Sequence, residues 1–212
     1  MQFYLVYSGP LSASGNSRKT NEIAKIRSQF HPQLEILWQK SAALQRLMAT
    51  SIVPSNESGH IGFTESPIGQ DWRQQDSIPL GWVSLIEPIR RGNSNFMPLI
   101  RKSLDLNCKL EILFLRQEDP GSLVLQGGDL DNRIKTLCDA LTIPNDDMAE
   151  RFPSNHALTH CLLESDALVS ALDVDTDRLL RPQSESNKEV HLVIKVTVRV
   201  LSVGNWNLPL VG

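Results

Sequence analysis

Residues Val190–Leu201 have the sequence VHLVIKVTVRVL, an apolar and β-branched run that predicts a strand. Cys108–Arg116 (CKLEILFLR) alternates into a similar apolar run and predicts a second strand. Phe3–Tyr7 (FYLVY) predicts a third, which ends at an SGP turn. Leu162–Val174 contains two further candidate strands. These segments are expected to build the sheet of the fold.

Two longer segments carry apolar residues at helical spacing. Asn21–Met48 is the longer one, and Pro32 is expected to divide it into two helices because proline removes a backbone donor. Leu130–Thr142 predicts one helix with a single apolar stripe. The stripe consists of Ile134, Leu137, Cys138 and Leu141. Met97–Leu104 predicts a short helix.

The segments between these elements are polar or short. Pro54–Leu80 is rich in Ser, Gly, Pro and Gln, which predicts a long loop. Pro144–Asn155 is polar and predicts a loop or insertion. The remaining expectations are strands at His60–Thr64, Trp82–Ile86 and Ser122–Leu125, and a basic turn at Pro88–Asn95.

Strands and helices mix along the chain without the regular alternation of a parallel α/β fold. The sequence therefore predicts a single α+β domain over residues 1–212, with one small mixed β-sheet and helices packed on it.

The formal net charge of −3 is weakly acidic. It argues against a protein that coats nucleic acid non-specifically, because phosphate binding needs a concentrated positive surface. It does not exclude a nuclease, since metal-binding carboxylates lower the net charge while a local basic patch faces the substrate.

The three cysteines, Cys108, Cys138 and Cys161, form no CxxC pair, which argues against a disulfide framework or a structural zinc site. The first apolar run, at about six residues, is too short for a signal peptide, and no later run approaches the roughly 18 residues of a membrane span. We expect no membrane association and a reducing, cytoplasmic setting.

The motif that indicates chemistry is Gly128–Lys135 (GDLDNRIK), followed by Asp139–Leu141 (DAL), at a loop-to-helix junction. Asp131, Lys135 and Asp139 are four residues apart in turn, so they line one edge of the predicted helix.

The residue types suit phosphoryl transfer. Asp129 and Asp131 are separated by one residue and could share a hard cation. Lys135 lies one turn further on, where it could meet a phosphate or the charge that develops on it. A metal ion, an anion and a lysine in one place are what this chemistry requires.

A structural interpretation of the same residues is equally open. Asp129 or Asp131 would cap the helix, Asn132 would lie in the first turn, and Lys135 would pair with Asp131 and Asp139. Such a cap contributes about 1 kcal/mol and each ion pair roughly a few tenths.

The pattern DxDNxxKxxxDAL resembles the signature of the RusA family of endodeoxyribonucleases, Holliday junction resolvases common in prophages and bacterial genomes. Its elements are Asp129, Asp131, Asn132 and Lys135, followed by the DAL at Asp139–Leu141. The opening YLVYSGPLSASGNSRK also resembles the start of that family. The specific match runs from Asp129 to Val169.

The family also carries a third essential aspartate, in an acidic pair at the start of a later strand. LLESDALV, residues Leu162–Val169, fits that position best. By resemblance, Asp166 is the third carboxylate and Glu164 is its closest rival.

The resemblance implies a RusA-like fold and a homodimer that cuts symmetrically across a four-way DNA junction with Mg²⁺. In that scheme Asp129, Asp131 and Asp166 are both the metal ligands and catalytic residues, and Lys135 stabilises the charge on the phosphate. Asn132 would orient a carboxylate or the substrate, and Asp139 has a supporting place on the same edge.

The chain departs from the family pattern in length and in detail. It is longer than compact members, with an expanded region at about Pro54–Asn107 and an insertion at about Asp146–His160. Ser165 interrupts the acidic pair, and Leu168 replaces the usual Gln after it.

Other candidate sites are weaker. The acidic alternation Asp173–Asp177 lacks the Gly and Glu that a calcium loop needs, and it predicts a solvated strand end. His156 and His160, with Cys161 adjacent, could bind a transition metal, but surface or loop histidines are favoured. Gly127 and Gly128 indicate turn geometry beside the motif.

Basic residues in loops and short helices are weak candidates for contacts with DNA phosphates, against solvated surface charge as the alternative. These are Arg18, Lys19, Arg90, Arg91, Arg101, Lys102 and Arg133.

The sequence leaves three functions to separate. The first is an Mg²⁺-dependent endonuclease of branched DNA. The second is a catalytically inactive relative that binds branched DNA, and the third is a non-enzymatic interaction domain with a capped helix.

Overall fold

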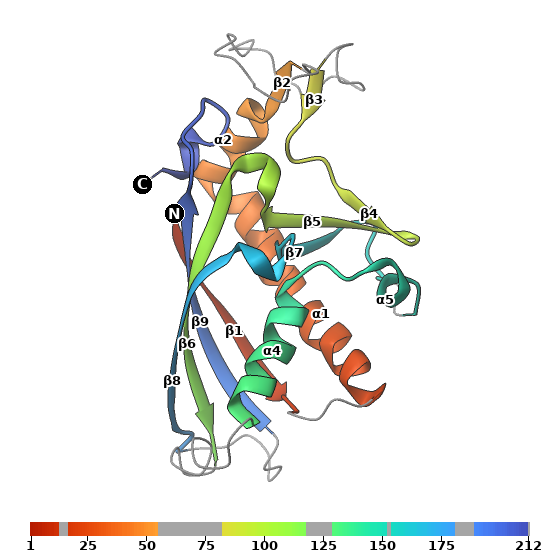
Figure 1. The fold of residues 1–212 in the computed structure, drawn as a ribbon, viewed down its shortest axis with the longest axis vertical. Helices are drawn as coiled ribbons and strands as arrows, with labels where there is room; N and C mark the ends of the chain where they lie inside the picture. The colour runs from red at the N-terminus through yellow and green to blue at the C-terminus, as the bar shows by residue number, and fades with distance from the viewer. Residues whose placement is uncertain (13–16, 55–81, 118–128, 152–153, 181–188, 212) are drawn as a thin grey trace.

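The computed structural model describes residues 1–12, 17–54, 82–117, 129–151, 154–180 and 189–211 (Figure 1). The side chains of residues 17–19, 54 and 129 are outside this description. The strands predicted at His60–Thr64 and Ser122–Leu125, and the glycines 127 and 128, also lie outside the described residues.

The main sheet is mixed and has the strand order β1-β9-β6-β8. These strands are β1 (Gln2–Pro10), β9 (Glu189–Val200), β6 (Leu106–Arg116) and β8 (Val169–Arg178). β9 runs antiparallel to both neighbours, whereas β6 and β8 are parallel. The strands predicted at both ends of the chain and before residue 116 are therefore confirmed, and the coarse α+β class with them.

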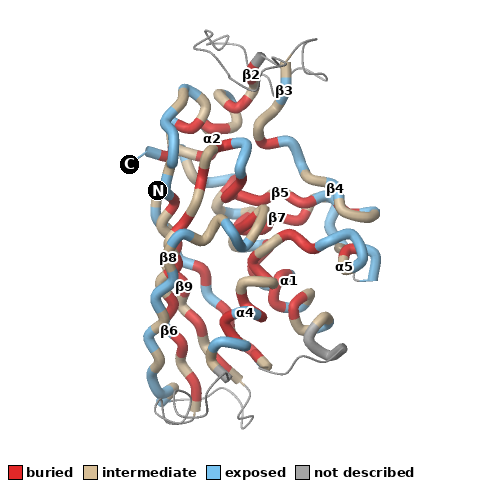
Figure 2. The backbone as a smooth tube through the Cα atoms, in the orientation of Figure 1, coloured by how far each residue is buried: buried red, intermediate tan, exposed pale blue. Residues whose placement is uncertain are grey.

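One face of this sheet forms the floor of the core. Side chains alternate between buried and less buried along β6 and β9 (Figure 2), as expected when only one face packs against helices. Helices α1 (Ser17–Lys40) and α4 (Asp129–Leu141) lie over that face (Figure 1). One buried cluster contains the sheet residues Leu110, Ile112 and Ile194 and the helix residues Ile26, Phe30, Leu34 and Leu137.

Helix α1 runs through Pro32, so the predicted division at this proline is wrong. A proline costs a helix interior about 3 kcal/mol. Ser28, whose carbonyl lacks the N–H that Pro32 cannot supply, is exposed, so water can hydrate that carbonyl, while Phe30 and Leu34 near the proline are buried. The break falls instead at Ser41, whose hydroxyl caps α2 (Ala42–Thr50) by accepting from the Leu44 N–H at 3.5 Å.

A second, three-stranded sheet has the order β4-β5-β7. It consists of β4 (Ile89–Arg91), β5 (Ser94–Ile100) and β7 (Thr159–Leu163). The helix predicted at Met97–Leu104 is therefore wrong, because β5 continues to Ile100 and only the 3₁₀ turn η2 (Lys102–Leu104) follows. Pro98 in β5 lies beyond the pairing with β4, where a missing N–H is tolerated.

Smaller elements complete the fold. β2 (Ile52–Pro54) pairs with β3 (Trp82–Ser84). The strand predicted at Trp82–Ile86 is therefore present but ends two residues earlier. The predicted loop after Pro144 contains a helix, α5 (Asp146–Arg151), which Asn145 caps through a 2.9 Å bond from the Met148 N–H. No helix in the described ranges is long and apolar enough to cross a membrane.

Candidate functional site

Helix α4 presents the sequence motif on an exposed edge. Its buried side is anchored to the chain that leaves β1: the Arg133 guanidinium donates to the Leu11 carbonyl, and the Thr136 hydroxyl to the Ser12 carbonyl at 3.4 Å. Asp131 and Lys135 are exposed on the other side. The apolar side of α4 therefore packs against the core, as its spacing predicted, and the charged residues on the opposite side face solvent.

The ion pairs of the structural interpretation do not form. Among the side chains that the structure describes, no carboxylate lies within 4.0 Å of the Lys135 ammonium, although Asp131 and Asp139 are its neighbours on the helix edge. Lys135 is thus exposed without a direct ion pair among the side chains that the structure describes. Asn132 is exposed beside it, and Asp139 is half-buried.

Asp166 lies on the connection between β7 and β8. It begins the 3₁₀ turn η3 (Asp166–Leu168), which Ser165 caps by accepting from the Ala167 N–H at 3.3 Å, and it is exposed. Burial, with smaller contributions from the Asp139 and Asp166 carboxylates, raises the pKa of the Cys138 thiol to about 11. The Asp166 carboxylate is therefore close enough to α4 to act electrostatically on a thiol of that helix.

Glu164 has a different environment from Asp166. Its Oε2 accepts from the Lys102 N–H at 2.8 Å, and its own N–H donates to the Ile100 carbonyl at 2.9 Å. The Glu164 carboxylate therefore accepts a hydrogen bond at the point where β5 ends and η2 begins. Of the two rival acids, Asp166 is the better placed to act with α4.

The predicted metal triad is described only in part. The Asp129 side chain lies outside the described residues. Among those described, Asp131, Asp139, Glu164 and Asp166 supply no group of three ligand atoms within 4.8 Å of one another. Convergence of Asp129, Asp131 and Asp166 on one ion stays a prediction.

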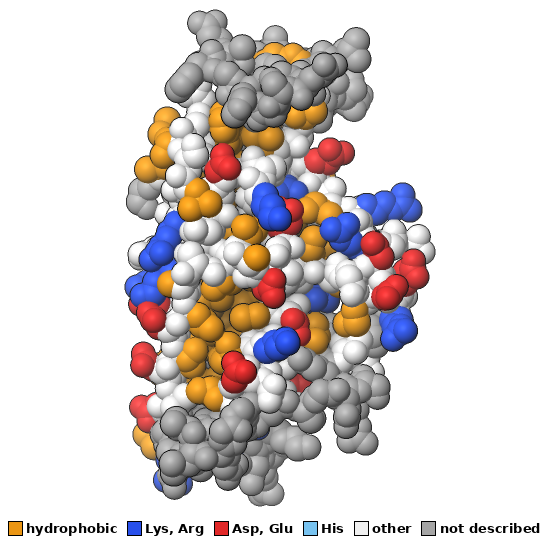
Figure 3. All heavy atoms as spheres, in the orientation of Figure 1, with side chains coloured by type: hydrophobic (Ala, Val, Ile, Leu, Met, Phe, Trp, Pro, Cys, Tyr) orange, Lys and Arg blue, Asp and Glu red, His pale blue; other side chains and the backbone are white. Residues whose placement is uncertain are grey.

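The surface around α4 is mixed in charge. Figure 3 shows an apolar strip between β8 and α4, with acidic and basic side chains along its α4 border. The weak candidates for DNA contact differ in exposure. Arg90 and Lys102 are exposed, and Arg91 is half-buried. The side chains of Arg18 and Lys19 lie outside the described residues.

Arg101 and Arg133 correct the sequence-based prediction. They are only 3% and 9% exposed, so their guanidinium groups are not available to DNA. Arg101 donates to the Glu87 carbonyl at 2.8 Å, and Arg133 holds the chain after β1. Arginine in a folded core satisfies backbone carbonyls in this way, and a count of basic residues cannot distinguish that role.

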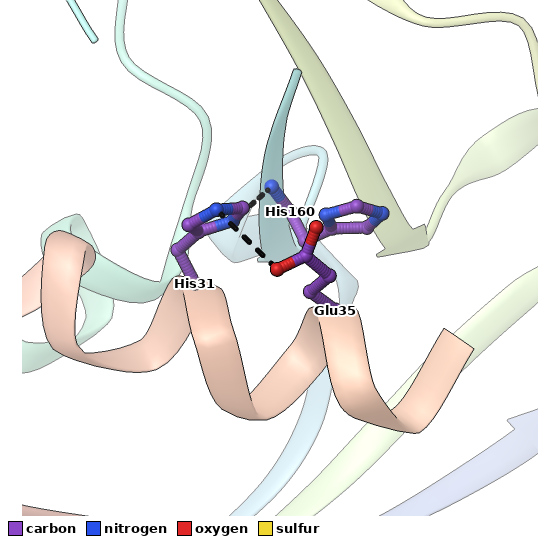
Figure 4. A group of neighbouring side chains, drawn as sticks. All are labelled: His31, Glu35 and His160. Atoms are coloured by element: carbon purple, nitrogen blue, oxygen red, sulfur yellow. Dashed lines mark hydrogen bonds and ion pairs between the residues drawn. The ribbon is translucent and has the colours of Figure 1, made fainter. Parts of the chain in front are cut away.

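A second group of titratable side chains lies where α1 meets β7. His31 and Glu35 come from α1 and His160 from β7, and one potential ligand atom of each lies within 4.8 Å of the others. Figure 4 shows the Glu35 carboxylate between the two imidazole rings. Among the described residues these three could hold a metal ion.

The hydrogen bonding of His31 opposes a preformed metal centre. The His160 N–H donates to His31 Nδ1 at 3.0 Å, so neutral His31 carries its proton on Nε2. That nitrogen faces Glu35 Oε2 at 4.0 Å. Metal-binding histidines instead donate their second N–H to an acceptor. Binding through Nε2 of His31 would therefore break the bond from His160.

Burial also changes the pKa values of the two histidines in this group. The pKa of His31 is lowered by burial and by nearby His156, whereas Glu35 partly offsets the change. Burial likewise lowers the pKa of His160. Both rings are thus favoured as neutral imidazoles. Nδ1 of His160 is buried and has no hydrogen-bond partner among the described residues.

Sequence reasoning found only part of this group. It named His160, but the predicted break at Pro32 separated His31 from Glu35, which lie four residues apart on one face of the continuous helix α1. Cys161 takes no part, because it is fully buried, and burial raises its pKa to about 12. The acidic alternation on β8 is a strand surface, where Asp173 pairs with Lys109 at 2.6 Å.

No protein-family model matches the chain, and neither a curated protein nor a solved structure shows significant similarity to it.

Proposed function

We propose that the chain is an Mg²⁺-dependent, structure-specific endodeoxyribonuclease that resolves Holliday junctions or other branched DNA by phosphodiester hydrolysis. The observation that supports the proposal is the electrostatic effect of Asp166, in η3, on Cys138 of α4, the helix that presents Asp131 and Lys135. A RusA-like site would need this third carboxylate near the helix motif, although the two segments are distant in sequence.

The donor chemistry fits a hard divalent cation. Asp131 and Asp166 are exposed carboxylates without an ion-pair partner in the described part of the chain. Their oxygens, with those of Asp129, would hold one or two Mg²⁺ ions. Bound Mg²⁺ activates water and stabilises the leaving oxygen in phosphodiester hydrolysis.

The chain's own residues have separable roles in this scheme. Lys135 would donate to the scissile phosphate, because its ammonium is exposed and not neutralised by a carboxylate within the described region. Asn132 would orient the substrate or a carboxylate. Arg90 and Lys102 would contact the DNA backbone outside the reacting centre, and a homodimer would provide two such centres for paired cuts.

The test is cleavage of a synthetic four-way junction by the full chain with Mg²⁺. Wild type should cut it, and Asp131→Asn should not, because the substitution removes a negative ligand and little volume. Asp147→Asn is the matched control: it changes an exposed aspartate in the first turn of α5 and should cut normally.

The alternatives predict different results in the same assay. Tight binding of the junction by wild type without cleavage would identify an inactive DNA-binding relative. If wild type neither binds nor cleaves the junction, the nuclease proposal is wrong and the interaction domain is the alternative that stays.

A further inference from the structure

A cavity of about 370 Å³ lies between the first half of α1 and the segment that joins α5 to β7. Three cationic side chains line it, Lys25 and Arg27 from α1 and Arg151 from α5, together with His31 and His156. None of Asp131, Lys135 and Asp166 lines it, so it is separate from the α4 edge.

The lining carries more positive than negative charge. No aspartate or glutamate is among the described residues that line the cavity, although Glu35 lies 4.0 Å from His31 and the Asp139 carboxylate acts on Arg27. Within the described ranges, no carboxylate lies within 4.0 Å of Lys25, Arg27 or Arg151. In a chain with a net charge of −3, this concentrates positive potential in one hollow.

Both walls of the cavity are fixed by hydrogen bonds. Arg27 is 9% exposed, and its guanidinium donates to the carbonyls of Asp139 at 2.9 Å and Thr142 at 3.2 Å. On the opposite wall, the Ser154 hydroxyl accepts from the His156 N–H at 3.1 Å and from the Thr159 hydroxyl. Arg27 and the Ser154 hydroxyl are therefore held in place before any ligand arrives, whereas the exposed Lys25 and Arg151 side chains border the opening.

We propose that this cavity binds a phosphoryl group. Lys and Arg side chains bind phosphate through charge-assisted hydrogen bonds, and the hydroxyl and amide groups of Ser28 and Asn155 add neutral donors. The buried ring of Phe96 offers an apolar surface for an organic portion. The volume lies within the range for small-molecule sites, so a ligand as large as a mononucleotide fits the dimensions.

A metal ion is a poorer match for the same place. His31 belongs to both the cavity and the group with Glu35 and His160. A cation there would be repelled by Lys25, Arg27 and Arg151, whereas an anion would be attracted. The ring of His156 lies 4.0 Å from that of His31, centroid to centroid, so both imidazoles border the ligand.

The test is a titration of the full chain with sodium phosphate at pH 7, against sodium chloride at equal ionic strength. Binding is followed by the imidazole C–H resonances and by Tm. Phosphate should shift the two histidine signals saturably, which chloride should not do. The double variant Lys25→Gln/Arg151→Gln, both exposed positions, should weaken phosphate binding by about tenfold or more.

The matched control is Lys40→Gln/Arg46→Gln, which removes one lysine and one arginine from exposed positions of α1 and α2 that do not line the cavity. It should change the affinity less than about twofold. The proposal falls if wild type gives no saturable response beyond chloride, or if the control loses as much affinity as the double variant.

Two further probes identify the source of the phosphoryl group. Adenosine 5′-monophosphate binding at least tenfold more tightly than phosphate would indicate a free nucleotide-like ligand. A single-stranded oligonucleotide that displaces phosphate, where the monophosphate does no better than phosphate, would indicate a nucleic acid strand. Neither arm depends on cleavage, so the result stands apart from the nuclease assay.

Discussion

The α4 edge and the α1 cavity hold their charged groups in opposite ways. On α4, Asp131 and Lys135 are exposed, and the backbone behind them is held by buried bonds from Arg133 and Thr136. In the cavity, Arg27 and His31 are themselves buried and hydrogen-bonded. An exposed charge keeps its hydration, so it has little desolvation cost and can contact a large substrate. A buried charge loses that hydration and needs hydrogen bonds from the protein to offset the loss. Under the two proposals, the exposed α4 edge would meet a polymer, and the cavity, bordered by the exposed Lys25 and Arg151, would receive a small anionic group.

The largest effect is expected at Lys135. Lys135→Met should lower the rate of junction cleavage by about 10²–10³-fold, the usual cost of removing one donor to developing charge. Single-turnover cleavage with Mg²⁺ measures it. Lys40→Met, an exposed lysine of α1, is the control, and cleavage by Lys135→Met at the wild-type rate would refute the catalytic role.

Arg27 should matter more for stability than any residue of the α4 edge. Arg27→Met would leave the Asp139 and Thr142 carbonyls without this donor, lowering the free energy of unfolding by about 3 kcal/mol. Urea denaturation measures the change. Arg46→Met, at an exposed arginine of α2, should stay within about 0.5 kcal/mol. Equal losses in the two variants would remove the distinction between buried and exposed cations.

The pH dependence of stability tests the His31 environment. Burial lowers the pKa of His31 in the folded state, so the unfolded chain binds the proton more tightly. Stability should therefore decline as the pH falls below the ordinary histidine value of about 6.5. Denaturation at pH 7.5 and pH 5.5 measures the decline.

The variant His31→Asn should reduce this pH dependence. Its side-chain oxygen can accept the His160 N–H in place of Nδ1, and it does not titrate. His191→Asn, a histidine of β9 that contacts Ser8, is the control and should keep the decline. An unchanged slope in His31→Asn would show that protonation elsewhere governs acid stability.

The smallest effect is expected for the stability of Asp131→Asn. Because Asp131 is exposed and its carboxylate is not within 4.0 Å of Lys135, thermal unfolding should change by less than about 0.5 kcal/mol. A loss near 1 kcal/mol would restore the structural interpretation, in which this residue caps and pairs within the helix.

Local pattern predicted the elements whose signal lies in one segment. The strand at Val190–Leu201 and the helix at Leu130–Thr142 each carry their own periodicity, and both are confirmed. The short helix α5 was missed although Asn145 and the first-turn acids Asp146 and Asp147 form an N-terminal signal.

Features set by tertiary packing were not predictable in this way. The helix through Pro32 continues because its flanking residues are buried, and β5 extends because β7, from a distant part of the chain, pairs with it. The same applies to the sites. The electrostatic effect of Asp166 on Cys138 of α4, and the meeting of His31 with His160, depend on elements far apart in sequence.

The ladder between β1 and β9 has a consequence for how the molecule is made. Gln2 lies opposite Thr197, and β9 is the strand that joins β1 to β6. During synthesis, β1 emerges from the ribosome long before its partner exists, so this ladder forms only after Glu189–Val200 has been translated. Such non-local pairing slows folding, because the chain loses conformational entropy in bringing β1 and β9 together before their contacts form. Meanwhile the apolar residues of β1 stay unpaired, which makes this strand the segment most exposed to misassembly in the nascent protein.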